Sequence, residues 1–186
     1  MKKFEILFFT SLVLVIIANT LSFGAEALSD NYYSKPDAII KEIKSRGAKA
    51  VVIELTRHWN VWDSICDNVA TGDEAWLKAA AALQAGTDAG SSEMVYLALG
   101  EALEYSPERV FKIVANTFNL QFICGCPDVD NARYNSYELS MKAINLRIKK
   151  VTAVKDRSLG KTSEECIRYL EESKKSVAEF YQVKEK

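Results

Sequence analysis

The segment that decides the fold runs from residue 73 to residue 106 and reads DEAWLKAAAALQAGTDAGSSEMVYLALGEALEYS. Apolar side chains recur every three or four residues on both sides of its Gly- and Ser-containing middle, which is the spacing of amphipathic helices. The first stripe comprises Trp76, Ala79, Ala80 and Leu83, and the second Val95, Ala98, Leu99 and Ala102. Because small alanine side chains let helices approach closely, we expect two helices that pack against each other as an antiparallel hairpin, joined at residues 86–92.

The same periodicity extends over the flanking sequence and predicts an all-α protein. Further helices are expected at residues 36–46, 48–57, 60–71, 108–116, 136–154 and 163–180. A run of β-branched residues at 51–53 could instead form a strand, but no partner strand is evident. We therefore predict about eight helices arranged as consecutive antiparallel hairpins, with a possible HEAT-like superhelical turn.

The last two predicted helices carry apolar stripes that we expect to face the core. For residues 136–154 the expected inward side chains are Leu139, Ala143, Leu146 and Val154. For the final helix they are Cys166, Ile167, Leu170, Val177 and Phe180. These stripes predict that both helices belong to the same core as the rest of the chain.

The first 27 residues have the features of a secretory signal peptide. Lys2 and Lys3 precede an apolar stretch over residues 4–17, and Ala25-Glu26-Ala27 fits a small-x-small cleavage site. An uncleaved membrane anchor is the alternative, although the apolar stretch is shorter than the roughly 20 residues that a span needs. We expect a signal peptide at 1–27, a single helical domain at 28–186, no stable membrane anchor after cleavage, and a periplasmic or secreted location.

Charge is almost balanced overall but unevenly distributed along the chain. Residues 28–186 contain 22 basic and 23 acidic side chains, which argues against a general nucleic-acid-binding protein. Residues 142–186 alone carry 12 basic and 7 acidic side chains. This excess is typical of solvated helix faces, and it would also suit an acidic partner or a membrane surface.

Four cysteines in a chain with an export signal predict disulfide bonding. We expect a bridge between Cys124 and Cys166, whereas Cys66 falls on a core stripe and could be either a small buried hydrophobe or a bridging thiol. The pairing of Cys126 stays open. The chain has a single histidine, and zinc usually takes four ligands, so we expect no metal site and no cofactor.

The residues that we single out as a candidate binding site are Asp88, Glu93, Trp59 and His58. Two carboxylates near a turn could perform acid–base chemistry on a glycan. Alternatively, Thr87 and Ser91 are capping candidates for the next helix and the acids complement its dipole, with Asp88 itself serving as a cap or turn residue. Trp59 could anchor an interface, although packing at the helix junction is the favoured alternative. His58 lacks a neighbouring nucleophile motif, and no Gly-x-Ser-x-Gly elbow occurs, so a structural histidine is the favoured alternative.

Several short motifs resemble a group of small exported bacterial proteins with a helical, HEAT-like architecture. They are Trp62-x-x-Ile65, Gly72-Asp73-x-x-Trp76-Leu77, Thr87-Asp88-Ala89-Gly90-x-Ser92-Glu93, and Ala102-Leu103 before Pro107. The similarity covers roughly residues 47–166. The resemblance implies an all-helical periplasmic protein, and it lends no catalytic residues because no activity is established for the group.

These observations favour an exported, non-enzymatic binding protein of the bacterial envelope, such as an inhibitor or immunity-type protein, whose partner is another protein. A carboxylate-dependent envelope enzyme, for instance a glycan hydrolase, is the alternative. The two classes differ in what the fold should present, because an enzyme needs converging acids in a cleft whereas a binding protein needs a complementary surface.

The signal peptide leads to a direct prediction about the exported chain. Cleavage after Ala27 should give a mature protein whose N-terminal residue is Leu28, as measured by N-terminal sequencing of material from the periplasm or the medium. Recovery of Met1 in a membrane fraction would contradict cleavage.

Overall fold

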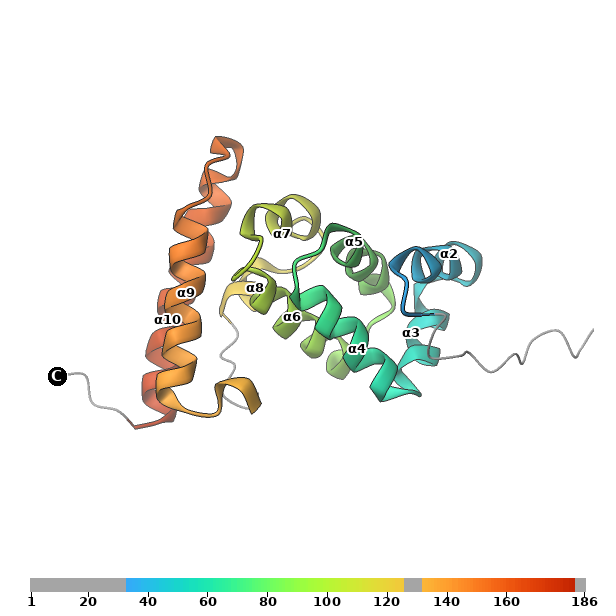
Figure 1. The fold of residues 1–186 in the computed structure, drawn as a ribbon, viewed down its shortest axis with the longest axis horizontal. Coiled ribbons are helices and arrows are strands. Elements are labelled where there is room, and N and C mark those ends of the chain that lie inside the picture. The colour runs from blue at the N-terminus through green and yellow to red at the C-terminus, as the bar shows by residue number, and fades with distance from the viewer. Residues whose placement is uncertain (1–32, 126–131, 183–186) are drawn as a thin grey trace, which may run out of the picture. The chain divides into compact units, whose positions relative to one another are not determined.

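The computed structural model describes residues 33–125 and 132–182, and every regular element within these ranges is a helix. The α-helices are α2 (Pro36–Arg46), α3 (Ala48–Thr56), α4 (Trp59–Ala70), α5 (Glu74–Leu83), α6 (Ala89–Ala102), α7 (Pro107–Val114), α8 (Leu120–Gly125), α9 (Tyr137–Thr152) and α10 (Gly160–Phe180). Three short 3-10 helices join them: η1 (Gln84–Gly86), η2 (Ala132–Tyr134) and η3 (Arg157–Leu159). The all-α prediction is confirmed for the described residues, and α8 is the one α-helix that the sequence pattern missed (Figure 1).

Side chains that the sequence places before several helices fix where these helices begin. The Asp73 carboxylate accepts hydrogen bonds from the backbone N–H groups of Ala75 and Trp76 and so caps α5. The Ser136 hydroxyl accepts from the N–H of Leu139 at the start of α9. Pro107 stands in the first turn of α7, where its missing N–H is not needed.

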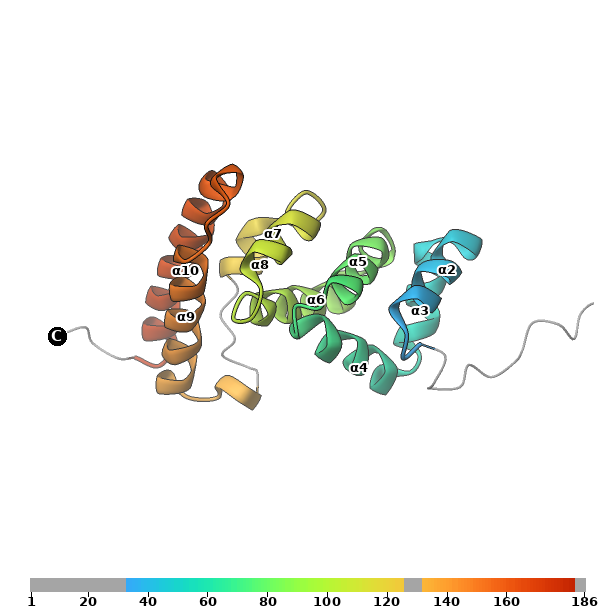
Figure 2. The same cartoon turned by 45° about the horizontal axis from the view of Figure 1, so that its top comes forward.

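Helices pack mainly with partners that are two or three positions away in the chain order. α4 packs against α6, and α6 packs against α8, while α2 packs against α5 and α5 against α7. Neighbouring helices also pair, as in α2 with α3, α4 with α5 and α9 with α10 (Figures 1 and 2). This is the pattern of helical pairs stacked side by side.

The expected direct packing of the two central helices is wrong. The stripe of α5 is buried against α2 and α7, and the stripe of α6 is buried against α4 and α8. Both stripes are as apolar as the sequence suggests, with Leu83 and Leu99 completely buried. Periodicity identifies which face of a helix is buried but not which helix covers it.

The short helix η1 fits tightly against the start of α3. A Cβ atom on Gly86 would collide with the backbone carbonyl of Ala48, so only glycine permits this approach. η1 thereby holds the end of α5 against α3 and fixes the point from which the chain turns into α6.

The last two helices form a long pair, and a disulfide ties this pair to α8. Cys124 of α8 and Cys166 of α10 are bridged, with a Cα–Cα distance of 5.4 Å, which confirms the predicted bridge. α10 also packs against α8, and α9 contacts α7. Cys66 is a buried free thiol, and Cys126 lies outside the described residues.

The predicted inward faces of the last two helices are only partly right. Leu139 and Phe180 are 42% and 57% exposed, whereas Ser140 and Arg147 of α9 are buried. Arg147 donates a hydrogen bond from Nε to Glu104 Oε1 at 3.1 Å, and its guanidinium lies over the Tyr134 ring. Hydrophobic periodicity cannot anticipate a buried arginine, because the ion pair that makes its burial tolerable comes from another part of the chain.

The described residues, which begin at Tyr33, belong to one compact unit. None of the helices within residues 33–125 and 132–182 is long and apolar enough to cross a membrane. The predicted signal peptide at 1–27 and its junction with the mature domain lie outside the described residues.

The bridge closes a loop whose ends are 42 residues apart, so its removal should enlarge the conformational freedom of the unfolded chain. We expect Cys166→Ser to lower the free energy of unfolding by about 2–5 kcal/mol, as measured by urea denaturation of exported protein. Unreduced, denatured wild type should expose no more than two free thiols to a thiol reagent.

A reducing buffer provides the control for this experiment. Wild type and Cys166→Ser should have similar stability once the bridge of the wild type is reduced. A difference that persists under reduction, or four reactive thiols in unreduced exported protein, would contradict a stabilising bridge.

Candidate functional site

A groove between α4 and α6 is the first candidate site. It encloses about 330 Å³. We define the α4–α6 groove by its lining residues, which are the apolar or thiol-bearing Cys66, Ala70, Met94, Leu97 and Ala98 together with the acids Asp63, Asp67 and Glu101. It therefore combines an apolar floor with an acidic rim.

The sequence builds this groove from one stripe on each helix. Its residues are spaced by three or four along both α4 and α6, so they line one face of each helix. Asp67 and Glu101 both lie in the last turns of their helices and share Arg133 as a partner, which shows that α4 and α6 run in the same direction. The side chains of Ala70 and Ala98 are small, which leaves room for the groove between the two helices. The unbranched side chain of Met94 adapts readily to a ligand.

Negative charge dominates the rim of the groove. Arg133 pairs with the buried carboxylate of Glu101 and lies 3.6 Å from an oxygen of Asp67. No cationic side chain of the described residues forms an ion pair with Asp63, which is exposed. The stretch from residue 58 to residue 104 contains eight acidic residues and one lysine, so this part of the molecule attracts cations.

The Cys66 thiol lies in the floor of the groove but is poorly suited to chemistry. Burial, reinforced by the nearby charges of Asp63 and Asp67, raises the pKa of this thiol to about 12. It therefore stays protonated at neutral pH, whereas nucleophilic attack and metal binding need the thiolate. The described residues contain no group of three or more His, Cys, Asp or Glu side chains that could hold a metal ion.

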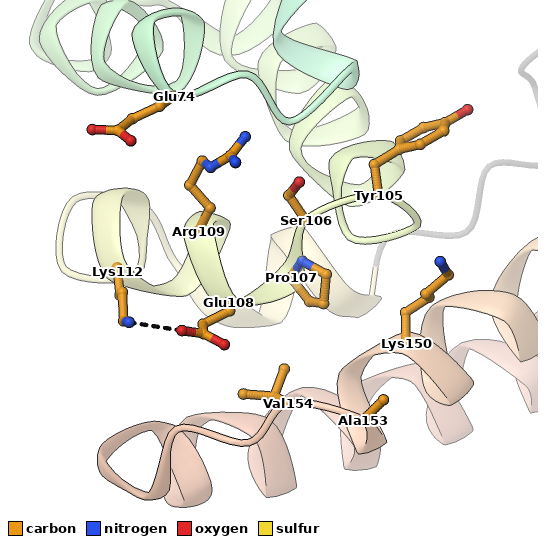
Figure 3. A pocket seen from close by; sticks show the side chains of 10 residues that line it. All are labelled: Glu74, Tyr105, Ser106, Pro107, Glu108, Arg109, Lys112, Lys150, Ala153 and Val154. Carbon is orange, nitrogen blue, oxygen red and sulfur yellow. Dashed lines mark hydrogen bonds and ion pairs between the residues drawn. The ribbon is translucent and has the colours of Figure 1, made fainter.

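A second cavity of about 490 Å³ lies where α7 meets the first turn of α5 and the end of α9 (Figure 3). We call it the α7–α9 pocket. Its lining residues are Glu74, Tyr105, Ser106, Pro107, Glu108, Arg109, Lys112, Lys150, Ala153 and Val154. Unlike the α4–α6 groove, it carries side chains of both charges.

Ion pairs organise one side of the α7–α9 pocket. Lys112 Nζ lies 2.8 Å from Glu108 and 2.9 Å from Asp156, and these contacts raise the pKa of Lys112. Hydrogen bonds from Lys112 and then from Ser158 lower the pKa of Asp156 to about 2. Lys112 and Asp156 therefore stay charged at neutral pH.

The structure assigns Asp88 the capping role that the sequence left as an alternative to chemistry. Its Oδ1 accepts hydrogen bonds from the Ser91 backbone N–H at 2.9 Å and from the Ser91 hydroxyl at 2.6 Å, while Ser91 Oγ accepts from the N–H of Asp88. These bonds lower the pKa of Asp88, which is opposite to what a general acid needs at neutral pH. Glu93 is exposed on α6, and neither acid lines the groove or the pocket.

His58 and Trp59 lie at the start of α4, and both are exposed. Trp59 is 52% exposed, so the alternative in which it packs at the junction is wrong. Because α4 and α6 run in the same direction, these two residues share an end of the helix pair with Asp88 and Glu93. No hydrogen bond or ion pair among the described side chains joins the four into one site.

The residues that matter most in the groove were not among those singled out from the sequence. Asp63, Asp67 and Glu101 each lie next to a predicted core stripe, at helical spacing from the small residues Ala70 and Ala98. The available signal was the excess of acids between residues 58 and 104. Its meaning depends on α4 and α6 being neighbours, which the sequence pattern does not reveal.

Comparisons with protein-family models, curated proteins and solved structures find no match to this chain. The resemblance to exported HEAT-like proteins therefore stays a prediction.

The capping role of Asp88 leads to a stability prediction. Asp88→Ala should lower the melting temperature by roughly 2–4 °C at pH 7, because the first turn of α6 loses a partner for its N–H groups. Since the pKa of Asp88 is lower in the folded state, its stabilisation is complete above the ordinary aspartate pKa of 3.8 and is lost as the pH falls below that value. The difference in melting temperature between wild type and Asp88→Ala, measured by circular dichroism, should therefore shrink as the pH falls below 3.8.

Glu93→Ala is the matched control, because it removes an exposed acid from the same helix outside the capping box. It should change the melting temperature by less than about 1 °C. Equal effects of the two variants would contradict a specific cap at Asp88.

Proposed function

We propose that this protein is an exported, non-enzymatic binding protein of the bacterial envelope, and that its α4–α6 groove binds a basic, partly apolar segment of another protein. The supporting observation is the meeting of an apolar floor with an acidic rim in one groove. An inhibitor or immunity-type protein, which occludes a functional surface of its partner, is the form of binding that we favour.

The size of the groove favours side chains of a polypeptide. A volume of about 330 Å³ holds one or two side chains, at the low end of what a small-molecule site encloses. Lysine and arginine have apolar stems and charged heads, so a stem can lie along Met94 and Leu97 while its head reaches Asp63 or Asp67. A basic segment would thus contact both the apolar floor and the acidic rim of the groove.

The surroundings of the groove support the same partner chemistry. The excess of acids over residues 58–104 would steer a basic surface toward it and favour fast association. Trp59, half-exposed at one end of the helix pair, is a side chain of the type that anchors protein interfaces. Asp88 and Glu93 at that end would add to the attraction, while Asp88 continues to cap α6.

The alternative of a glycan hydrolase draws less support. Such an enzyme needs one carboxyl group that stays protonated near neutral pH and a second one within about 5–9.5 Å of it. The hydrogen bonds from Ser91 lower the pKa of Asp88 and engage its carboxylate in the helix cap. Asp88 is therefore better suited to holding the start of α6.

The test is a comparison of two double variants with the same change in charge. Asp63→Asn/Asp67→Asn neutralises the rim of the groove, and Glu164→Gln/Glu179→Gln neutralises two exposed acids on α10. Proteins captured from a periplasmic extract by the wild type are identified by mass spectrometry, and the affinity of the purified partner is then measured for each variant. The rim variant should weaken binding about tenfold or more, and the α10 variant by less than about threefold.

Salt and substrate experiments complete the test. Raising the ionic strength from about 0.05 M to 0.5 M should weaken the wild-type complex and have less effect on the rim variant. Equal affinities of the two double variants would contradict binding in the groove. Hydrolysis of a cell-wall glycan by the purified protein, abolished by Asp88→Asn or Glu93→Gln, would overturn the non-enzymatic proposal itself.

A further inference from the structure

We propose that the α7–α9 pocket is a second binding site, and that its ligand carries an oxyanion, a phosphate or a carboxylate, attached to an apolar body. This inference is independent of the function proposed for the α4–α6 groove. It rests on the cavity of about 490 Å³, on the charges that line it, and on the apolar wall beside them.

Two cations line the pocket without forming an ion pair among the described residues. Lys150, in the last turn of α9, is exposed and is part of no ion pair there. Arg109, on α7, donates a hydrogen bond to the backbone carbonyl of Gly72 at 2.7 Å, which holds its side chain, and its charge contributes to lowering the pKa of Glu74. Figure 3 shows these two cations on different walls, with Pro107 between them.

The acids of the pocket, in contrast, are already paired. Glu74 lies 2.6 Å from Lys78 on α5, and the same contact lowers the pKa of Glu74. Glu108 and the neighbouring Asp156 share Lys112. Lys112 offsets one of these two acidic charges, and with Arg109 and Lys150 the pocket keeps a small net positive charge for a ligand.

Basic residues continue from the pocket over the turn between α9 and α10. Residues 149–161 contain five basic side chains and one acidic side chain, and η3 within this stretch packs against α7. Lys149, Lys155, Arg157 and Lys161 are exposed. Their combined field should raise the local concentration of anions at the mouth of the pocket.

The uncharged lining residues of the pocket account for the apolar body of the proposed ligand. Pro107, Ala153 and Val154 form an apolar wall, while the hydroxyl groups of Ser106 and Tyr105 can donate hydrogen bonds to an anion. Tyr105 is 66% exposed and adds a ring to the rim of the pocket. A bare phosphate would leave most of the space and the whole apolar wall unused, whereas a phosphate or carboxylate with a short hydrocarbon part would use both.

Titrations with two small probes test this inference on the purified exported protein. Inorganic phosphate and hexyl phosphate are added at constant ionic strength, and backbone amide resonances are followed by NMR. We expect saturable shifts confined to residues 105–112 and 150–154, with hexyl phosphate binding roughly fivefold or more tightly because its chain covers the apolar wall. Lys150→Glu should weaken the binding of both phosphates about tenfold. Lys142→Glu, which makes the same change elsewhere on α9, should alter the affinity for either phosphate by less than about twofold.

Vesicles distinguish the two natural sources of such a group. Co-sedimentation with phosphatidylglycerol vesicles, but not with phosphatidylcholine vesicles, that is lost in Lys150→Glu and kept in Lys142→Glu would identify a lipid headgroup. Binding of the soluble probes alone would identify a free anionic ligand. The absence of saturable shifts with both phosphates, or equal losses in the two lysine variants, would overturn the proposal, because diffuse attraction to a basic surface would then explain the data. Normal circular dichroism and melting temperature of each variant show that folding is intact.

Discussion

The close approach of η1 to α3 is the constraint on which the rest of the arrangement depends. Gly86 lies against the backbone of Ala48, so the end of α5 is fixed beside the beginning of α3. Three residues after Gly86 the chain begins α6 at Ala89, so this contact helps to fix where α6 starts. α6 runs in the same direction as α4, as the shared contact of Asp67 and Glu101 with Arg133 shows, and it packs against α4 so that the α4–α6 groove lies between them.

The C-terminal helix pair brings a surface of opposite charge to the same compact unit. The Cys124–Cys166 bridge and the buried contact of Arg147 with Glu104 join α9 and α10 to α8 and to the end of α6. The acidic stretch of residues 58–104 and the basic turn between α9 and α10 are thus held on one scaffold. Such a scaffold can offer separate sites to a basic and to an anionic ligand without large rearrangements.

Helix positions and the disulfide could be predicted because they depend on local chemistry. Apolar spacing, Pro107 and the caps mark the helices, and the bridge could be expected from the predicted export signal and the placement of the cysteines. Helix partners could not be predicted, since the buried stripe of α5 fits several possible neighbours. The burial of Arg147 and the shared contact of Asp67 and Glu101 with Arg133 depend on contacts between segments that are distant in the sequence. Hydrophobic periodicity therefore could not predict the groove.

The most direct test of the central claim is hydrogen exchange of the protein in complex with its captured partner. If the α4–α6 groove is the binding site, amides on α4 and α6 around Asp63, Asp67 and Leu97 should exchange more slowly in the complex than in the free protein, and those of α9 and α10 should be unchanged. Protection confined to α9 and α10, with no change on α4 and α6, would contradict the account.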